Sequence, residues 1–243
     1  MNLEAIYNKI KNGEMSLAQT QKELSLSFLE DAGRNIVDVR RTMRTGIPEI
    51  VYGEHKTFQQ IIEITDRILE HNPLAIISRC KEPQKIQSHY SPAQEVHTQD
   101  HTVVIGELPK TNGSVLVLSG GASDHIIASE VSMTLSALGV KPLVFEDRGI
   151  AHPTRVLDAI KTGIQEDVSA VIVIAGMEAA LASFVCSLVA LPVIGVPASI
   201  GYGYKAKESA LISMLSACTP NLAVVNIDGG VRAAVIAALI AKR

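Results

Sequence analysis

The sequence predicts a doubly wound, parallel α/β sheet in the second half of the chain and a smaller mixed α/β domain in the first half. Short runs that are apolar on both faces alternate with helical segments, as in a buried parallel sheet. Charged side chains are denser before Gly113 than after it, and the loop-like stretch 111–114 lies at the change. We therefore expect domains at residues 1–113 and 114–243.

The first half predicts helices and two short strands. Residues 2–32 have helical periodicity, with a break at 13–16 where Ser16 is a suitable N-cap. Two short strands are expected to flank one helix, in the order 49–52, 57–71 and 75–78. The first domain is therefore expected to mix both kinds of element.

Three arginines, Arg40, Arg41 and Arg44, occur within five positions. They form either the solvated face of a helix or a clamp for a phosphate or carboxylate, which guanidinium groups bind through paired hydrogen bonds. In the second case we expect Arg40, Arg41 or Arg44 to contact the anion together with Arg79.

The second half alternates strands and helices to its end. The predicted strands are 115–118, 142–145, 170–174, 193–196 and 222–227, and the predicted helices are 123–138, 154–163, 178–189, 207–216 and 230–241. Ligands of such sheets bind at the carboxyl ends of the strands. The candidate site residues are therefore sought there.

Composition excludes several classes of protein. The net charge of the 243 residues is −3, and no run of Lys and Arg offers a surface for nucleic acid. Three scattered cysteines suit neither a disulfide framework nor a zinc site, and the first residues lack the apolar core of a signal peptide. Glycines and prolines interrupt the nearly uncharged stretch 168–204, which favours buried strands over a membrane helix. We expect a cytoplasmic protein with free thiols and no membrane partner.

A turn of small residues, Ser119-Gly-Gly-Ala-Ser-Asp124, follows the first strand of the predicted sheet. The backbone of Gly121 and the side chains of Ser123 and Asp124 are candidates for binding an anion at a helix N-terminus. The adjacent glycines do not match the dinucleotide fingerprint, and Ser123 or Asp124 is equally suited to a simple N-cap.

Three of the five predicted strands end near a carboxylate, at Asp147, Glu178 and Asp228. Each alone is more often a cap or a loop salt bridge. Glu178, however, is the only formal charge between Asp167 and Lys205, and an isolated carboxylate needs a partner or a cation. The sequence therefore favours a functional role for Asp147 and Glu178.

Glycines next to these strand ends are candidates for close approach to a ligand. The loop 197–204 carries Gly201, Tyr202 and Gly203, and Gly176 lies just before Glu178. The loop is either a plain connection or a cover for a ligand. We expect it to share one pocket with Ser123, Asp124, Asp147 and Glu178.

Two further side chains are candidates for chemistry. Cys218 lies where a predicted helix ends before the last strand, whereas Cys186 lies inside an apolar helix and Cys80 near the end of a short strand. His152 opens a helix and is a candidate acid or base.

These motifs resemble a known family. The second half resembles the PurE fold of N5-carboxyaminoimidazole ribonucleotide mutases, and the chain as a whole is similar to the LarB family of nickel-pincer cofactor biosynthesis proteins. The resemblance is carried by Gly120 to Asp124, Ala151 to Thr154, Ile174 to Glu178, Leu191 to Pro197, Ser199 to Gly203, Met214 to Cys218 and Ala223 to Gly229, and in the first half by Asp38, Arg40, Arg44, Gly46 to Gly53, Lys56-Thr57 and Ser78-Arg79.

The resemblance implies a pyridinium-3,5-biscarboxylic acid mononucleotide synthase. Enzymes of this kind carboxylate the pyridinium ring of nicotinic acid adenine dinucleotide at C5, using CO2 or bicarbonate, and hydrolyse the phosphoanhydride to release AMP. It also implies a divalent cation, with Mg²⁺ the expected one, and a homo-octamer. The N-terminal domain is expected to contact substrate and the C-terminal domain to be catalytic.

The chemistry explains the need for a thiol. A pyridinium ring is too electron-poor to attack CO2, but addition of the Cys218 thiolate to the ring creates an enamine with a nucleophilic C5. A base then removes the C5 proton, and loss of the thiolate restores the aromatic ring. Asp147 or Glu178 is the candidate for that base or for binding the cation.

Two other functions remain open. His152 favours a mutase of the PurE type, in which an imidazole moves the proton, while Cys218 and the N-terminal domain count against it. Departures from the LarB pattern at Ser129, His152 and Glu208 allow a nucleotide-binding module without activity.

Overall fold

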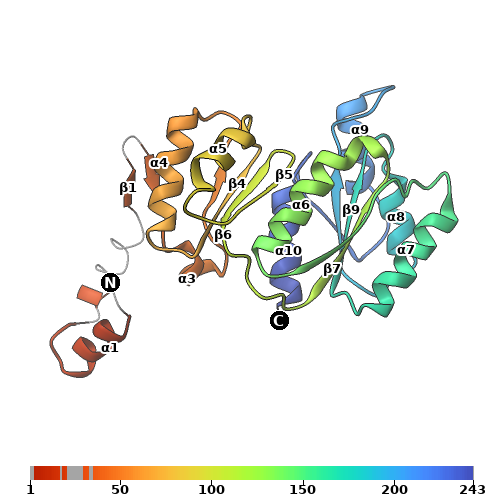
Figure 1. Cartoon of the computed structure of the whole chain (residues 1–243). Helices are drawn as coiled ribbons and strands as arrows, with labels where there is room; N and C mark the ends of the chain where they lie inside the picture. Colours follow the sequence, from red (N-terminus) through yellow and green to blue (C-terminus); the bar gives the residue numbers. More distant parts are fainter. Residues whose placement is uncertain (1–2, 17, 21–29, 33–34, 243) are drawn as a thin grey trace.

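The computed structural model describes residues 3–16, 18–20, 30–32 and 35–242. Their strands form a two-stranded, a four-stranded and a five-stranded sheet. The two larger sheets and their helices make up the body of the molecule, and helix α1 (Leu3–Lys11) lies apart from it (Figure 1).

The N-terminal segment is only partly helical. Helix α1 agrees with the prediction, and the backbone N–H of Gln19 donates to Ser16 Oγ over 3.3 Å, as expected for an N-cap. The prediction is wrong for β1 (Glu30–Ala32), which pairs antiparallel with β2 (Asn35–Val37). The rest of the predicted helical segment, residues 17 and 21–29, lies outside the described residues.

A four-stranded mixed sheet forms the core of the first domain. Its strands lie in the order β3-β4-β6-β5; β3 is parallel to β4, and the other pairs are antiparallel. The elements are α3 (Arg41–Thr45), β3 (Ile50–Tyr52), α4 (Phe58–Leu69), β4 (Leu74–Ser78), α5 (Pro83–Tyr90), β5 (Val96–Gln99) and β6 (Thr102–Gly106). Thr57 and Gln60 form a reciprocal capping box that starts α4 where the sequence predicts it.

The second domain is a five-stranded sheet in which every pair is parallel, which confirms the predicted fold class. The order β11-β10-β9-β7-β8 reverses direction at β7, as in doubly wound folds. The elements are β7 (Ser114–Ser119), η1 (Ala122–Asp124), α6 (His125–Ala137), β8 (Lys141–Phe145), α7 (Pro153–Gln165), β9 (Ala170–Ala175), α8 (Ala180–Cys186), β10 (Val193–Pro197), α9 (Ala206–Leu215), β11 (Leu222–Val224) and α10 (Gly230–Ala241).

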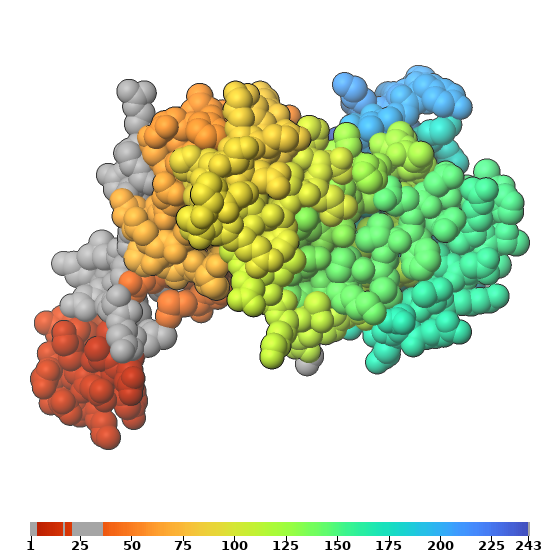
Figure 2. All heavy atoms as spheres, viewed as in Figure 1, coloured from red at the N-terminus to blue at the C-terminus, as the bar shows by residue number. Residues whose placement is uncertain are grey.

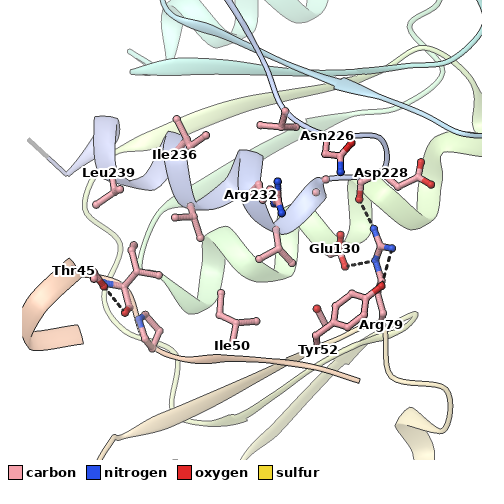
Figure 3. A pocket seen from close by; sticks show the side chains of 18 of the residues that line it. Thr45, Ile50, Tyr52, Arg79, Glu130, Asn226, Asp228, Arg232, Ile236 and Leu239 are labelled. Atoms are coloured by element: carbon pink, nitrogen blue, oxygen red, sulfur yellow. Dashed lines mark hydrogen bonds and ion pairs between the residues drawn. The ribbon is translucent and has the colours of Figure 1, made fainter. Parts of the chain in front are cut away.

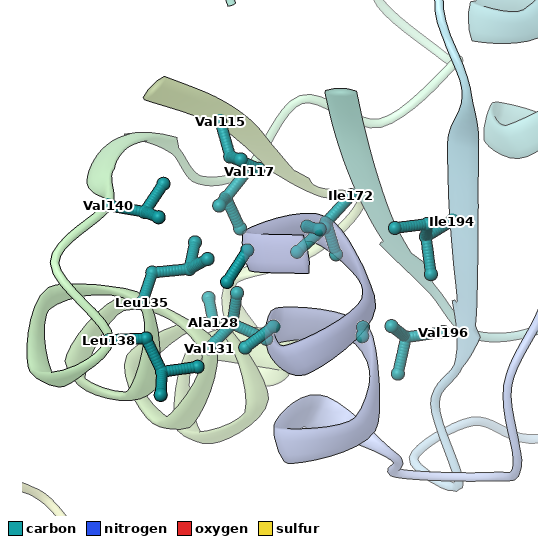
Figure 4. Packing of buried hydrophobic residues seen from close by; sticks show 14 of the residues in the cluster. Val115, Val117, Ala128, Val131, Leu135, Leu138, Val140, Ile172, Ile194 and Val196 are labelled. Carbon is teal, nitrogen blue, oxygen red and sulfur yellow. The ribbon is translucent and has the colours of Figure 1, made fainter. Parts of the chain in front are cut away.

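Helices cover both faces of this sheet. Helices α6 and α10 pack on one face, where Val131 and Leu135 of α6 meet Val117 and Ile172 of the strands (Figure 4). Helices α7, α8 and α9 bury the other face. Burial on both sides explains why the strand sequences are apolar throughout.

The same core continues into the first domain. Ile76 and Val104 of the four-stranded sheet belong to the cluster that contains α6 and α10. These two helices therefore join the two sheets. In the described part of the chain, no helix is long and apolar enough to cross a membrane.

Candidate functional site

A cavity of about 420 Å³ lies at the carboxyl ends of the parallel strands, the edge that we call the carboxyl rim. It is lined by the turns after β7, β8 and β9 and by the loop after β10. The lining residues are Gly120, Gly121, Ser123, Asp124, Gly149, Ile150, Ala151, Ala175, Gly176, Met177, Glu178, Ala179, Ala180, Leu181, Ile200, Gly201 and Tyr202. We call it the rim cavity.

The turn after β7 is held by its own carboxylate. The backbone N–H of Gly121 donates to Asp124 Oδ2 over 3.0 Å, and Asp124 is only 3% exposed. Burial raises the pKa of Asp124, and hydrogen bonds from the backbone of Gly121 and Gly120 act in the opposite direction. Asp124 thus shapes the turn, while Ser123 is exposed beside the cavity.

The turn after β9 brings the backbone close to the opposite loop. A Cβ atom on Gly176 would lie 2.4 Å from the carbonyl oxygen of Ile200, so only glycine fits there. Met177 and Ala179 adopt positive φ values of 49° and 51°, which delays helix α8 to Ala180. Glu178 is exposed on the cavity wall, and no ion pair joins it to another described residue.

Most of the residues predicted for one pocket meet in the rim cavity: Gly121, Ser123, Asp124, Gly176, Glu178, Gly201 and Tyr202. Asp147 and Gly203 do not line it, which corrects the expectation for those two residues. The Asp147 side chain is 62% exposed and faces Arg155 of α7 at 3.3 Å. His152 also lies outside the cavity lining and approaches Thr154 Oγ1 at 2.9 Å.

Cys218 is exposed and lies at the other edge of the sheet. It precedes β11, whose first residue Leu222 pairs with Val193 at the start of β10. The rim cavity, by contrast, lies beyond the last residues of β7 and β9. The sequence predicts a chemical role for Cys218 but not its position relative to the sheet. The structure separates Cys218 from Glu178 by the length of the sheet.

Two further cavities lie between the domains, with volumes of about 880 and 430 Å³. Both are lined by Arg79, Glu130 and Asp228. Figure 3 shows these residues at the wall of the larger cavity. Arg79 Nη2 donates to the carbonyl oxygen of Asp228, and Arg79 Nε lies 3.5 Å from Glu130 Oε1. Arg79 Nη1 also reaches the Tyr52 hydroxyl over 3.3 Å, so all three guanidinium nitrogens are engaged.

Glu130 and Asp228 complete this network, and the sequence analysis did not assign them to it. Glu130 is 6% exposed, and burial raises its pKa while the charge of Arg79 acts in the opposite direction. The Asp228 carboxylate accepts from the backbone N–H of Ser199 over 2.8 Å. Glu130 is the only Asp, Glu, Lys or Arg in helix α6, a signal like the one that singled out Glu178.

The other predicted arginines lie apart from the rim cavity. Arg44 forms an ion pair with Asp38, and neither Arg40 nor Arg44 is among the residues that line the cavities described above. Arg41, which lies between them, lines the larger cavity between the domains and pairs with Glu49 at 2.9 Å. Anion binding by Arg40 and Arg44 stays a prediction.

The described residues offer few ligands for a divalent cation. Within the described residues, no three His, Cys, Asp or Glu side chains converge as a metal site. Mg²⁺ needs only one or two carboxylates when substrate phosphates supply other ligands. Glu178, whose carboxylate forms no ion pair with another described residue and lies in the same cavity as the Gly121 to Asp124 turn, fits that requirement.

Comparison with known proteins divides the chain at the same place as the two sheets. Residues 29–106 match the LarB/PurE-like N-terminal domain family, and residues 114–243 match the AIR carboxylase family. An uncharacterized protein of Methanocaldococcus jannaschii is 37% identical over 254 aligned positions, which span 99% of this chain and 97% of that protein. The crystal structure of a PurE2 variant from Treponema denticola covers 54% of this chain and 80% of its own, with 26% identity and a TM-score of 0.46.

Proposed function

Because the chain belongs to the AIR carboxylase family and has the domain order of LarB proteins, we propose that it makes pyridinium-3,5-biscarboxylic acid mononucleotide. The substrate is nicotinic acid adenine dinucleotide, which the enzyme carboxylates with CO2 or bicarbonate and cleaves to release AMP. The domain order is the observation that carries this proposal, since PurE-type mutases lack the N-terminal domain. The product would feed synthesis of the nickel-pincer cofactor.

The rim cavity suits one half of such a dinucleotide. Most residues that line it are small or apolar. The Gly121 to Asp124 turn offers backbone N–H and hydroxyl groups to a phosphate at the start of α6. Tyr202 and Gly201 supply the loop that lies over the opposite side. A cationic ring next to Glu178 would gain a favourable charge contact.

Carboxylation proceeds through a covalent adduct in this proposal. Because one chain places Cys218 and Glu178 at opposite edges of the sheet, the Cys218 in this proposal comes from a neighbouring copy of the assembly. Its thiolate donates an electron pair to a ring carbon, and the resulting enamine attacks CO2 through C5. Glu178 then accepts the C5 proton, and the C–S electron pair returns to sulfur as the aromatic ring reforms. The cavity lining favours Glu178 over Asp147 as the base.

Hydrolysis of the phosphoanhydride requires charge neutralisation at the phosphates. Glu178 and the substrate phosphates would hold Mg²⁺, which would polarise the P–O bond. The eight-copy assembly and the anion contacts of Arg40 and Arg44 belong to the same proposal.

A mutase of the PurE type is the second candidate, because the AIR carboxylase match covers the whole C-terminal domain. His152 would then move the proton, although it lies outside the lining of the rim cavity. Incubation with nicotinic acid adenine dinucleotide, bicarbonate and Mg²⁺ separates the candidates. We expect AMP and a mononucleotide heavier by one carboxylate; turnover of carboxyaminoimidazole ribonucleotide alone would favour the mutase, and turnover of neither a silent binding module.

A further inference from the structure

We propose that the adenosine half of a dinucleotide binds in the cavity of about 430 Å³ between the domains. Lys81 and His101 of the first domain and Ile126 and Ile200 of the second domain border it, and we call it the smaller interdomain cavity. The inference rests on the proposed function, in which the rim cavity holds the pyridinium ring of the same molecule. The observation behind it is that the two cavities meet at Ile200.

The smaller interdomain cavity continues directly from the rim cavity. Ile200 lines both. The segment that runs from η1 into α6 lines the rim cavity with Ser123 and Asp124 and the smaller interdomain cavity with Ile126 and Ile127. The larger cavity between the domains, by contrast, shares no described lining residue with the rim cavity. A dinucleotide whose ring lies in the rim cavity therefore has the smaller interdomain cavity next to it for its other half.

The wall from the first domain is fixed by paired hydrogen bonds. The backbone N–H of Cys80 donates to the carbonyl oxygen of His101 over 2.7 Å, and His101 Nδ1 lies 3.1 Å from the carbonyl oxygen of Cys80. Because a carbonyl oxygen only accepts, Nδ1 carries the proton, and Nε2 of the neutral ring is an acceptor. Gly53 N–H donates to the carbonyl oxygen of Ser78 over 2.8 Å, which holds Glu54 at the same wall. The wall thus offers a ring nitrogen and a carboxylate as acceptors.

The wall from the second domain is apolar where it borders the cavity. Ile126 is 49% exposed and Ile200 47%, and both line the cavity. Figure 2 shows the yellow surface of the first domain in contact with the green surface of the second. Apolar side chains of this kind suit the face of a purine ring, because contact removes apolar surface of both groups from water.

The charges of the smaller interdomain cavity favour a nucleoside over a phosphate. Its described lining residues include three carboxylates, Glu54, Glu130 and Asp228, and two cations, Arg79 and Lys81. The excess of carboxylates disfavours a phosphate. Adenosine, in contrast, is uncharged and offers donors at its amino group and its ribose hydroxyls. Carboxylates accept from ribose hydroxyls in dinucleotide-binding folds, so this donor set matches the cavity.

This placement gives the first domain a task that only a dinucleotide requires. Every described residue that lines the rim cavity belongs to the second domain, so a mononucleotide needs no contact with the first. The adenosine needs the wall that Lys81 and His101 border. The phosphates then lie beside the Gly121 to Asp124 turn, and the first domain selects dinucleotides over mononucleotides.

Two probes that correspond to the two halves of the dinucleotide test the placement. Adenosine has no phosphate and probes the smaller interdomain cavity, whereas nicotinic acid mononucleotide probes the rim cavity. Ile126→Trp places a bulkier side chain in the smaller interdomain cavity. Gly121→Asp is the matched variant at the rim cavity, where it adds a negative charge at a residue whose φ of −129° accommodates a side chain.

Isothermal titration calorimetry on the full chain measures both affinities. Ile126→Trp should weaken adenosine binding by about tenfold or more and leave binding of the mononucleotide unchanged. Gly121→Asp should do the reverse. Ile126→Asp is a second variant, because it replaces the apolar wall with a further carboxylate. Ile164→Trp is the control, since Ile164 of α7 is 61% exposed and lines none of the three cavities, and it should bind both probes as the wild type does.

The placement is overturned if the wild type does not bind adenosine, or if both Ile126 variants bind it with wild-type affinity. Failure of the proposed function has a different signature. If adenosine binding depends on Ile126 but the wild type does not turn over nicotinic acid adenine dinucleotide, the adenosine site stands and the proposed reaction falls. If the dinucleotide is turned over with the same KM by the wild type and Ile126→Trp, the reaction stands and the placement falls.

Discussion

Arg79 links the two domains through a chain of contacts that ends at the rim cavity. Its guanidinium group holds the carbonyl oxygen of Asp228, and the Asp228 carboxylate holds the backbone N–H of Ser199, next to the loop over the cavity. Because protein groups contact all three guanidinium nitrogens of Arg79, the structure favours a positioning role for Arg79 over the predicted direct contact with an anion. Arg79 itself has φ 50°, so the backbone aims the side chain across the domain boundary.

Replacement of Arg79 by Met should lower the free energy of unfolding by about 1–3 kcal/mol, because it leaves the buried Glu130 carboxylate without its cation. Urea denaturation measures the loss. Arg67→Met is the matched control, since Arg67 pairs with Glu70 on the surface of α4. Glu130→Gln in the Arg79→Met background should recover part of the loss, and equal midpoints for Arg79→Met and wild type would contradict the network.

At the level of single residues, sequence reasoning found the groups that short local motifs define. Gly121, Ser123 and Asp124 share one turn, and Glu178 stood out by its isolation in apolar sequence. It missed the Arg79–Glu130 pair, whose members are distant in sequence and meet only through packing between the domains. It also grouped Asp147 with the cavity, because strand ends alone do not show which way a side chain turns.

Helix α6 joins the domains at its first turn as well as through its core face. His125 Nε2 lies 3.1 Å from Asp100 of the first domain, and His125 Nδ1 lies 2.8 Å from Glu146, just after β8. The hydrogen bond with Glu146 raises the pKa of His125, and partial desolvation acts in the opposite direction. His125 thus lies between two carboxylates, both of which favour its protonated form.

This arrangement predicts a pH dependence of stability. Because the pKa of His125 is raised in the folded state, its contribution to stability is fully present below the unfolded-state pKa of about 6.5. That contribution is lost as the pH rises through the folded-state pKa. The thermal midpoint of the wild type should therefore fall between about pH 6 and pH 9 by more than that of His125→Gln. Thermal denaturation across this pH range measures the fall. An equal fall of the midpoint in wild type and His125→Gln would contradict a stabilising role for His125.

Elements were predictable where burial is two-sided. Apolar runs predict the five parallel strands, whereas β5 contains His97 and Gln99 and is half-buried, so its residues do not predict a strand. Strand β11 stops at Val224, shorter than predicted, because Asp228 turns the chain with φ 54° before α10. Propensity does not reveal such a turn, which depends on contacts with Arg79 and Ser199.

The two larger sheets share helices α6 and α10, with a rim cavity at one edge of the five-stranded sheet and the exposed Cys218 thiol at the other. The order of strands and helices in the C-terminal domain followed from the sequence. The distance between Cys218 and Glu178 did not follow from the sequence, because it depends on the edge of the sheet at which each of these two residues lies.

The central claim is that the Cys218 thiolate forms a covalent adduct with the pyridinium ring. Wild type, Cys218→Ser and Cys186→Ser are each mixed with nicotinic acid adenine dinucleotide, bicarbonate and Mg²⁺, and carboxylated product and the absorbance of a dihydropyridine adduct are recorded. A thiol of pKa about 8.5 supplies some thiolate near neutral pH, whereas a serine hydroxyl supplies almost no alkoxide.

Cys218→Ser should therefore lose both signals while keeping its fold, since Cys218 is exposed and the change is nearly isosteric. Cys186→Ser should lower stability and keep activity, because Cys186 is buried at the C-terminal end of α8, in the core on that face of the sheet. Carboxylation by Cys218→Ser at the wild-type rate would contradict the account and move the chemistry to His152.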